Sequence, residues 1–257
     1  MSTLPTWVKN YADAQGDAQR HSPQPWVSSL RQKALERFAT EGWPSRRIEE
    51  WRHTSMLPME QREFDVVAAE FDRSKVKERV AQLKKIEPQA HWAVFINGRL
   101  DDELSELEGY NPKGLFYNTS ELLGSEDSDL QSAIQHKWGQ AEDGFITHAL
   151  NLALASEGVY VQVPAGVQVE TTLHIVHVHA QAQAATFNRC IFDVAENAHL
   201  KVVEHHISTV QESGLSNTMS RAWLGKNANM FHLRIQQEND TTVHLSGIQA
   251  FQEESSH

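Results

Sequence analysis

The chain has 257 residues, of which 40% are apolar, and its 34 acidic and 23 basic side chains give a formal net charge of −11 at pH 7. This acidic balance, with no long Lys/Arg block, argues against nucleic acid as a partner. The N-terminus MSTLPTWVKNYADAQ lacks an apolar signal core, and no apolar run approaches the roughly 18 residues that span a bilayer, so we expect a cytoplasmic protein with no membrane partner.

Residues 1–88 have the spacing of amphipathic helices. The segment 25–42, PWVSSLRQKALERFATEG, has Pro near its start, Gly past its end and one apolar helical stripe. That stripe consists of Val27, Leu30, Ala34 and Phe38. Residues 71–87 repeat the pattern with Val76, Val80 and Leu83. We therefore expect a small α-helical N-terminal domain over residues 1–88.

The segment 42–54, GWPSRRIEEWRHT, is too dense in large side chains for a flexible linker. Gly42 suits the residue that follows a helix, and Pro44 disfavours the α region for the preceding residue, so the segment begins with a defined break. We expect Trp43 and Trp51 to pack the helices onto a neighbouring part of the molecule. The charged side chains expected to pair among themselves are Arg47, Glu49, Glu50 and Arg52.

Residues 91–154 mix strand and helix signals. HWAVFINGRL, residues 91–100, has an apolar run and an Asn-Gly pair, which predict a strand and a tight turn. Helical spacing resumes in ELLGSEDSDLQSAIQHKW and in ITHALNLALAS. This region is expected to connect the N-terminal helices to the C-terminal part of the chain.

Past residue 157, three passages share a pattern of strand, small turn and strand. They are GVYVQVPAGVQVETTLHIVH, NRCIFDVAENAHLKVVEHHI and SRAWLGKNANMFHLRIQQEN. Aligning Gly166 with Asn197 and Asn227 gives spacings of 31 and 30 residues, within the range of solenoid repeats. Equivalent strands one coil apart then lie parallel. The fold expected is mainly β: a right-handed parallel β-helix over residues 89–257, preceded by the helical domain.

This alignment also predicts which side chains stack. In the first strand of each repeat, three inward ladders are expected: Val159, Cys190 and Ser220; Val161, Phe192 and Ala222; and Val163, Val194 and Leu224. In the second strand, Thr172 is expected to stack on Val203 and Leu233, and His174 on His205 and Ile235. The opposite, outward face is expected to carry two ladders: Leu173, Glu204 and Arg234; and Ile175, His206 and Gln236. Glu204 and Arg234 would then form an exposed ion pair.

The end of the sequence coincides with the start of a further repeat. One more period beyond Asn227 reaches His257, and the segment TTVHLSGIQAFQEESSH contains no capping helix. We expect an incomplete β-helix whose later coils and C-terminal helical region are missing. The alternative is that the final acidic residues and serines form a natural polar end of the solenoid. The exposed strand edges predict self-association, including a homodimer.

Several segments, in order, resemble the SufB/SufD family of iron–sulfur cluster assembly proteins. The first is GWPSRRIEEWRHTSML, with its Pro, its Glu-x-Trp-Arg and its Thr. It is followed by VFINGRL, by THALNLALASEGVYVQVPAGVQVETTLHIVH and by VAENAHLKVVEHH. The spacing from the first of these segments to the β-helix resembles that of the SufD branch more than that of SufB. The chain also lacks the long insertion typical of SufB. The resemblance runs from about Gly42 to near the end.

The resemblance implies a non-catalytic scaffold subunit that pairs with SufB through the β-helix and with the ATPase SufC through a C-terminal helical region. It also implies no tightly bound cofactor, but a transient iron–sulfur cluster or iron shared with a partner. Family members are much longer, and the interface and SufC-docking residues fall beyond this sequence. No catalytic, cofactor-binding or metal-binding residue is therefore assigned from the family.

The histidines and the single cysteine are the candidate metal ligands. His177 and His179 share a strand face, and His174 lies one coil from His205, close enough to bridge a metal. Zinc normally takes at least three protein ligands, and Ile235 occupies the next rung, so structural histidines are favoured. Cys190, on an inward ladder, is expected to be a core residue. One cysteine cannot hold a cluster alone.

Two other functions remain as alternatives. A carbohydrate-active β-helix enzyme would use a groove populated by Lys201, Glu204 and Arg234, although no secretion signal is present. A His-rich metal-binding protein is the other alternative, limited by the ligand count. The sequence contains neither a G-x-x-x-x-G-K-[ST] loop nor G-x-G-x-x-G, so any ATP is expected to bind to another subunit.

Overall fold

The fold is described from a computed structural model, which describes residues 4–19, 24–65, 70–110, 115–155 and 157–257. The α-helices are α1 (Thr6–Gln19), α2 (Pro25–Glu41), α3 (Leu57–Glu60), α4 (Arg73–Lys84), α5 (Thr119–Gly124), α6 (Ser128–Trp138) and α7 (Ile146–Leu154), with a 3-10 turn at Glu49–Trp51. The strands are β1 (His91–Ile96), β2 (Arg99–Leu100), β3 (Phe116–Asn118), β4 (Glu157–Val163), β5 (Leu173–His179), β6 (Ala185–Val194), β7 (His199–Ser208), β8 (Leu215–Leu224), β9 (Asn229–Gln237) and β10 (Val243–Gln252). The protein is therefore a β-solenoid preceded by a helical N-terminal region, and it is mixed α/β overall.

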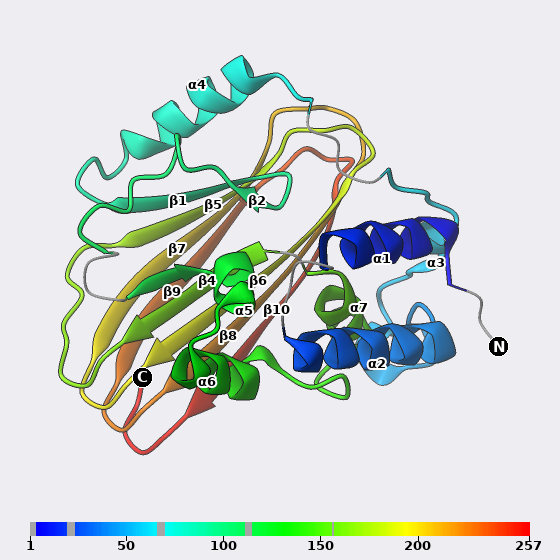
Figure 1. The fold of residues 1–257 in the computed structure, drawn as a ribbon. Coiled ribbons are helices and arrows are strands. Elements are labelled where there is room, and N and C mark those ends of the chain that lie inside the picture. The colour runs from blue at the N-terminus through cyan, green and yellow to red at the C-terminus, as the bar shows by residue number, and fades with distance from the viewer. Residues whose placement is uncertain (1–3, 20–23, 66–69, 111–114, 156) are drawn as a thin grey trace.

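The strands form a parallel β-solenoid with two facing sheets (Figure 1). One sheet has the order β2-β1-β5-β7-β9 and the other has the order β10-β8-β6-β4-β3. Each coil contributes one strand to each sheet, so β4, β6, β8 and β10 are parallel neighbours, as are β5, β7 and β9. This confirms the solenoid predicted from the repeats.

The three predicted inward ladders are present in the sheet that contains β4, β6 and β8. Val159 pairs with Cys190 and Cys190 with Ser220, and the ladders of Val161 and Val163 are also in the expected register. Strand β10 continues them, with Ile248 beside Ser220. The apolar core between the sheets is built on these rungs together with the inward residues Leu173, Ile175, Leu200 and Val202.

The second-strand ladders differ from the prediction in register within the first coil. Leu173 pairs with Val202 rather than with Glu204, and His174 pairs with Val203 rather than with His205. The cause is the connection between the two strands. Leu173 lies ten residues after Val163, whereas Val202 lies only eight after Val194, so an alignment without a gap is displaced by two. Because two residues preserve strand alternation, the face groupings themselves are unchanged.

The prediction that Glu204 and Arg234 lie on the outward face is wrong. They are on neighbouring rungs, as expected, but their face looks into the solenoid, and Glu204 is completely buried. The apolar residues Leu173, Ile175 and Val202 share this face and pack in the interior. The pair is therefore a buried one, for which desolvation matters more than in a surface ion pair.

Helices cover the outer faces of both sheets. Helix α7 packs on the outer face of β6, β8 and β10, and α1 and α2 pack on α7 (Figure 1). Helix α4 covers the other sheet through Val76, Val80 and Leu83, which pack with Trp92 and Val176. The predicted helices 25–42 and 71–87 are confirmed, with Gly42 at a φ of 67° past the end of α2. The division at residue 88 stays a prediction.

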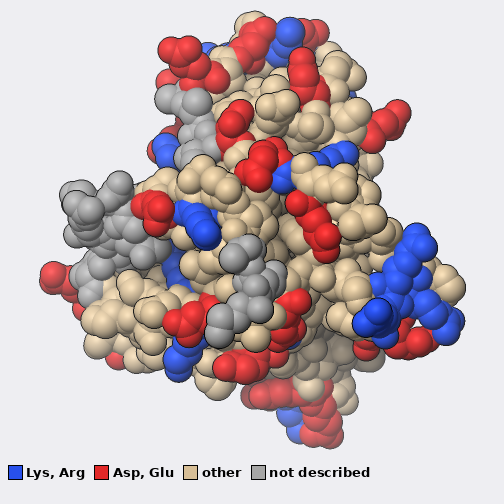
Figure 2. Space-filling model, turned by 90° about the vertical axis from the view of Figure 1, so that its right-hand side faces the viewer, with Lys and Arg blue, Asp and Glu red and all other residues tan. Residues whose placement is uncertain are grey.

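One end of the solenoid is closed by the residues that precede it. Strand β1 adds in parallel to β5, and β3 adds antiparallel to β4. The predicted tight turn is present, because Asn97 and Gly98 both have positive φ and β1 pairs antiparallel with β2. In the described part of the chain, no helix combines the length and apolar character needed to cross a membrane. Figure 2 shows acidic side chains spread over the face that carries α1 and α2, with basic ones in small groups.

Candidate functional site in the solenoid interior

The space between the two sheets is divided along the strands into an apolar part and a polar part. The apolar part contains Val161, Val163, Ile175, Phe192, Val194 and Val202. Towards the ends of β5, β7 and β9, the same inward faces carry ionisable side chains instead, and these are either buried or of intermediate burial. These residues, the interior polar cluster, are His177, Glu204, His206, His232, Arg234, Glu238 and His244.

Glu204 is the most strongly bound member of this cluster. Its carboxylate accepts hydrogen bonds from Ser220 Oγ at 2.5 Å, His232 Nε2 at 2.9 Å and Arg234 Nε at 3.0 Å. Burial by itself raises the pKa of Glu204, but the neighbouring imidazoles of His206 and His232 and the charge of Arg234 outweigh it and hold the pKa well below its usual range. Glu204 is therefore a carboxylate with a permanent cationic partner.

His177 and His206 lie beside this carboxylate with unused ring nitrogens. The rings stack with centroids 4.8 Å apart, and only 6% of His177 and none of His206 is exposed. None of their four nitrogens has a well-formed hydrogen bond to a described residue, since the Nε2 of His206 is 3.5 Å from Glu204 Oε2. Burial lowers the pKa of both rings, so both are neutral. Each unpaired buried group costs about 1–3 kcal/mol.

A second carboxylate reaches the cluster from the connection between β9 and β10. Glu238 Oε2 lies 2.8 Å from His244 Nδ1, and the His244 ring meets that of His206 edge to face at 4.5 Å. The Glu238 side chain is only 3% exposed. Burial tends to raise its pKa, but hydrogen bonding with His244, assisted by Ser216, lowers it below the usual value. The interior thus holds a second anion, beside imidazoles.

Two groups of three residues in the cluster have donor atoms close enough to share a metal ion. One is His177, Glu204 and His206, and the other is His206, Glu238 and His244. In each group the ligand atoms lie within 4.8 Å of one another. Imidazole and carboxylate donors together suit divalent first-row transition metals. The arrangement is therefore chemically able to hold such an ion.

The histidine pair singled out in the sequence, His174 and His205, lies on the outer face of the same sheet. The Nδ1 of His174 is 2.8 Å from the Nε2 of His205, and its Nε2 is 3.0 Å from Glu87 Oε2. Both rings stack on Trp92. Each nitrogen of His174 is thus used in a hydrogen-bonded chain, which is the arrangement of a structural histidine.

Cys190 lies in the interior apolar core, where its ladder placed it. It is completely buried, and burial raises the pKa of its thiol well above the usual value. A neutral, enclosed thiol is a poor metal ligand or sulfur acceptor, because those roles require an accessible thiolate. The structure therefore supports the interpretation of Cys190 as a core residue.

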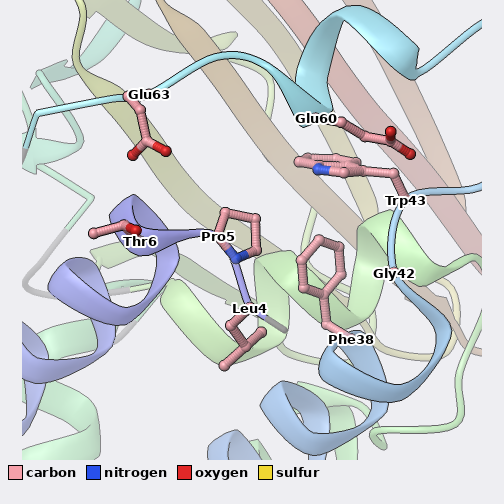
Figure 3. Close-up of a pocket in the computed structure, with 8 residues that line it drawn as sticks. All are labelled: Leu4, Pro5, Thr6, Phe38, Gly42, Trp43, Glu60 and Glu63. Carbon is pink, nitrogen blue, oxygen red and sulfur yellow. The ribbon is translucent and has the colours of Figure 1, made fainter. Parts of the chain in front are cut away.

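The start of the segment 42–54, Gly42 and Trp43, lines a pocket of about 450 Å³ between α1, α2 and α3 (Figure 3). Trp43 packs edge-on against Phe38 with ring centroids 5.1 Å apart, and Glu60 and Glu63 also line the pocket. Trp51 meets Phe145, just before α7, at 6.3 Å. Arg52 and Glu49 form an exposed ion pair at 3.2 Å. Both tryptophans thus dock the segment within the molecule.

Sequence reasoning missed most of the interior polar cluster. The repeat pattern assigns Glu204, His206 and Arg234 to the outward face, and it gives no indication that Glu238 and His244 lie nearby. A usable signal was present, because Leu200 and Val202 precede Glu204 and His206 on the same strand face. Apolar residues at the start of that face indicate that it turns inward. The meeting of His244 with His206 has no local signal, since the two lie on opposite sheets.

Comparison with known proteins gives a match along the whole chain. The family model described as the SufBD protein N-terminal region matches residues 1–175. The model described as the SUF system FeS cluster assembly, SufBD core domain, matches residues 176–257.

Individual relatives agree with these family models. The chain is 26% identical over 217 residues to the iron–sulfur cluster assembly protein SufD of Bacillus subtilis, covering 83% of this chain and 49% of the relative. It is 26% identical to a SufBD family protein of Synechocystis sp. over 230 residues, with 84% and 49% covered. It is 22% identical to SufD of Escherichia coli over 219 residues, with 84% and 47% covered. The chain spans about half the length of the curated relatives it matches.

Proposed function

The chain belongs to the SufBD family of iron–sulfur cluster assembly proteins, and from this membership we propose that it acts as a non-catalytic scaffold subunit of a cytoplasmic SUF assembly complex. The observation that carries the proposal is the match of two consecutive family models, which together run from residue 1 to residue 257. The individual relatives named SufD support the SufD branch. The proposed activity is assembly with partners, without turnover by this chain.

The proposed partners are a SufB homologue and the ATPase SufC. The resemblance places family interface residues beyond this sequence, so the pairing with SufB proposed for this chain uses what its solenoid itself offers: β9 and β10 are the last strands of their sheets, and each has one edge without a neighbouring strand among the described residues. Large apolar side chains are exposed on these two strands: Phe231, Leu233, Ile248 and Phe251. A free strand edge with apolar side chains is suited to receiving another strand.

The proposed cargo, a transient iron–sulfur cluster or iron, is proposed to be shared with a partner rather than held by this chain's thiol. Cys190 is enclosed, so cluster thiolates would come from elsewhere in the complex. The ATP needed by the complex would bind to SufC, in line with the absence of a phosphate-binding loop in the sequence.

Co-expression with the SufB and SufC homologues of the same organism tests this function. We expect the untagged chain to co-purify with tagged SufB, and Leu233→Asp to weaken that recovery at least tenfold. Leu57→Asp is the matched control, because Leu57 is also exposed but lies in α3. Failure of the unmodified chain to co-purify with either homologue would contradict the proposal.

The same strand edges give a second test with the chain alone. We expect its mean mass in light scattering to rise with concentration, because edge pairing satisfies backbone groups in a second copy. Leu233→Asp should shift this association to higher concentration, and Leu57→Asp should not. A constant monomer mass throughout would count against pairing through this edge.

A further inference from the structure

The interior polar cluster contains a buried carboxylate without a permanent cation. Glu238 lies 2.8 Å from His244 Nδ1, and the completely buried His206 is in ring contact with His244. We propose that His206, Glu238 and His244 form a binding site for one divalent first-row transition-metal ion inside the solenoid. This inference rests on side-chain geometry and is independent of the proposed scaffold function.

The two groups of potential ligands differ in how their carboxylates are neutralised. Glu204 already has Arg234 at 2.8 Å, and a metal ion there would face a fixed positive charge. No Lys or Arg ion pair with Glu238 is present among the described residues, and its close charged or ionisable contact is His244. A dication would therefore be favoured at Glu238 and opposed at Glu204, although both groups contain two histidines.

Unused donor capacity is the second observation. Neither ring nitrogen of His206 has a hydrogen-bond partner among the described residues, although the ring is completely buried. Buried polar atoms in folded proteins are nearly always satisfied by protein, water or an ion. Coordination to a metal would use one of these nitrogens, and it would replace the contact between His244 and Glu238 with two metal–ligand bonds.

The distances require a modest adjustment of the side chains. Ligand atoms within 4.8 Å of one another must approach to the separations set by metal–ligand bonds of about 2.0–2.2 Å. The three side chains would rotate towards one another from separate elements, because His206, Glu238 and His244 come from β7, from the β9–β10 connection and from β10. Since β7 and β10 belong to different sheets, the ion would link the sheets.

Access to this group is also better than to the other one. Glu238 and His244 are of intermediate burial as whole residues, with side chains 3% and 8% exposed, whereas all three members of the Glu204 group are buried. The β9–β10 connection is therefore the less enclosed side of the cluster. Two imidazoles and one carboxylate leave coordination positions free for water or a further ligand.

Titration with Co²⁺ tests the site, because the ligand-field absorption of Co²⁺ reports coordination directly. The purified, untagged chain is treated with chelator, transferred to chelator-free buffer and titrated with CoCl₂. We expect one equivalent to bind, with visible bands and a rise in melting temperature. Glu238→Gln keeps a hydrogen-bonding group beside His244 but loses the charge, and should bind at least tenfold more weakly, as should His244→Ala. Zn²⁺ should displace the Co²⁺.

Two matched variants give the test its specificity. Glu204→Gln alters the other carboxylate and should leave Co²⁺ affinity within about threefold of the unmodified chain. His136→Ala removes an exposed imidazole and should leave affinity unchanged. Circular dichroism checks that each variant is folded. The proposal is overturned if the chain binds no Co²⁺, if folded Glu238→Gln binds as the unmodified chain does, or if Glu204→Gln or His136→Ala causes the loss.

Discussion

Two buried polar regions lie on opposite sides of the sheet that contains β6 and β8, and they are built differently. The outer region, under α7, centres on Arg189, which donates to Trp138 O at 2.7 Å and to Asn151 Oδ1 at 2.8 Å. The interior polar cluster centres on Glu204 and the histidines next to it. The outer region is thus organised around buried cations and the inner one around buried carboxylates.

The difference shows how burial of polar groups can serve attachment in one place and binding in another. In the outer region, Asn151 also donates to the backbone oxygens of Asn188 and Asn217, so α7 is fixed to two successive coils. In the interior, His177 and His206 have ring nitrogens without partners among the described residues. The outer region also has buried nitrogens without partners among the described residues, on Trp138, His148 and Arg221, so the contrast lies in their chemistry. Among those residues, only the interior places unpartnered imidazoles and carboxylates close enough together to share a metal ion, where they leave capacity for a ligand.

The strongest test of the outer region is Asn151→Ala. The substitution removes two hydrogen bonds to backbone oxygens and leaves the Arg189 guanidinium without its side-chain acceptor. We expect the free energy of unfolding to fall by about 3–5 kcal/mol, measured by urea denaturation. Asn229→Ala, at an exposed position of β9, is the control and should change stability by less than about 0.5 kcal/mol. Equal losses of stability in the two variants would show that the Asn151 side chain does not attach α7 to the coils.

A double-mutant cycle tests the interior pair. Glu204→Gln leaves Arg234 without its carboxylate, and because the Arg234 side chain is 15% exposed we expect a loss of about 2–3 kcal/mol. Arg234→Met should cost a similar amount by leaving Glu204 uncompensated. The double variant should lose less than the sum of the two, as measured by urea denaturation. Strict additivity would mean that the two groups do not interact.

The pH dependence of stability gives the smallest expected effect and concerns the outer region. Burial, reinforced by the positive charges of Arg189, Arg221 and Arg37, lowers the pKa of His148 to about 4. The unfolded chain therefore takes up this proton at higher pH, so the stabilisation is complete above about pH 6.5 and is lost as pH falls towards 4.

Comparison with His148→Gln isolates this contribution. Allowing for the partial exposure of His148, we expect the native chain to lose about 1 kcal/mol more than the variant between pH 7 and pH 5. Urea denaturation at each pH measures the difference. Parallel pH profiles for the two chains would show that His148 does not carry this effect.

Much of the architecture was predictable because it depends on short-range patterns. The spacing of Val159, Cys190 and Ser220 predicted their ladder, since residues equivalent between coils meet in parallel strands. Helix α2 was predicted from its apolar stripe with Pro25 and Gly42 at its limits, and the β1–β2 turn from Asn-Gly. Each of these signals lies within one element or recurs at a regular spacing from repeat to repeat.

The candidate site was predictable only in part. That His177 and His179 share a face followed from strand alternation. The closeness of His174 to His205 was also predicted, but the two meet across strands displaced by two residues from the predicted register, since His174 pairs with Val203. The register within the first coil was displaced because its connection is two residues longer than the next, as the pairing of Leu173 with Val202 shows. Repeat alignment without gaps has no means of detecting such a difference.

The sequence by itself determined that residues 157–252 form stacked coils and which residues of each strand share a face. Only the tertiary structure decided that the face of Glu204 and His206 turns inward, and that Glu238 and His244 meet them there. The physical reason is that side chains alternate along a strand with a period of two, which shows which residues share a face but not which face is buried. Burial depends on how the second sheet closes over the first, and His244 reaches His206 from that second sheet.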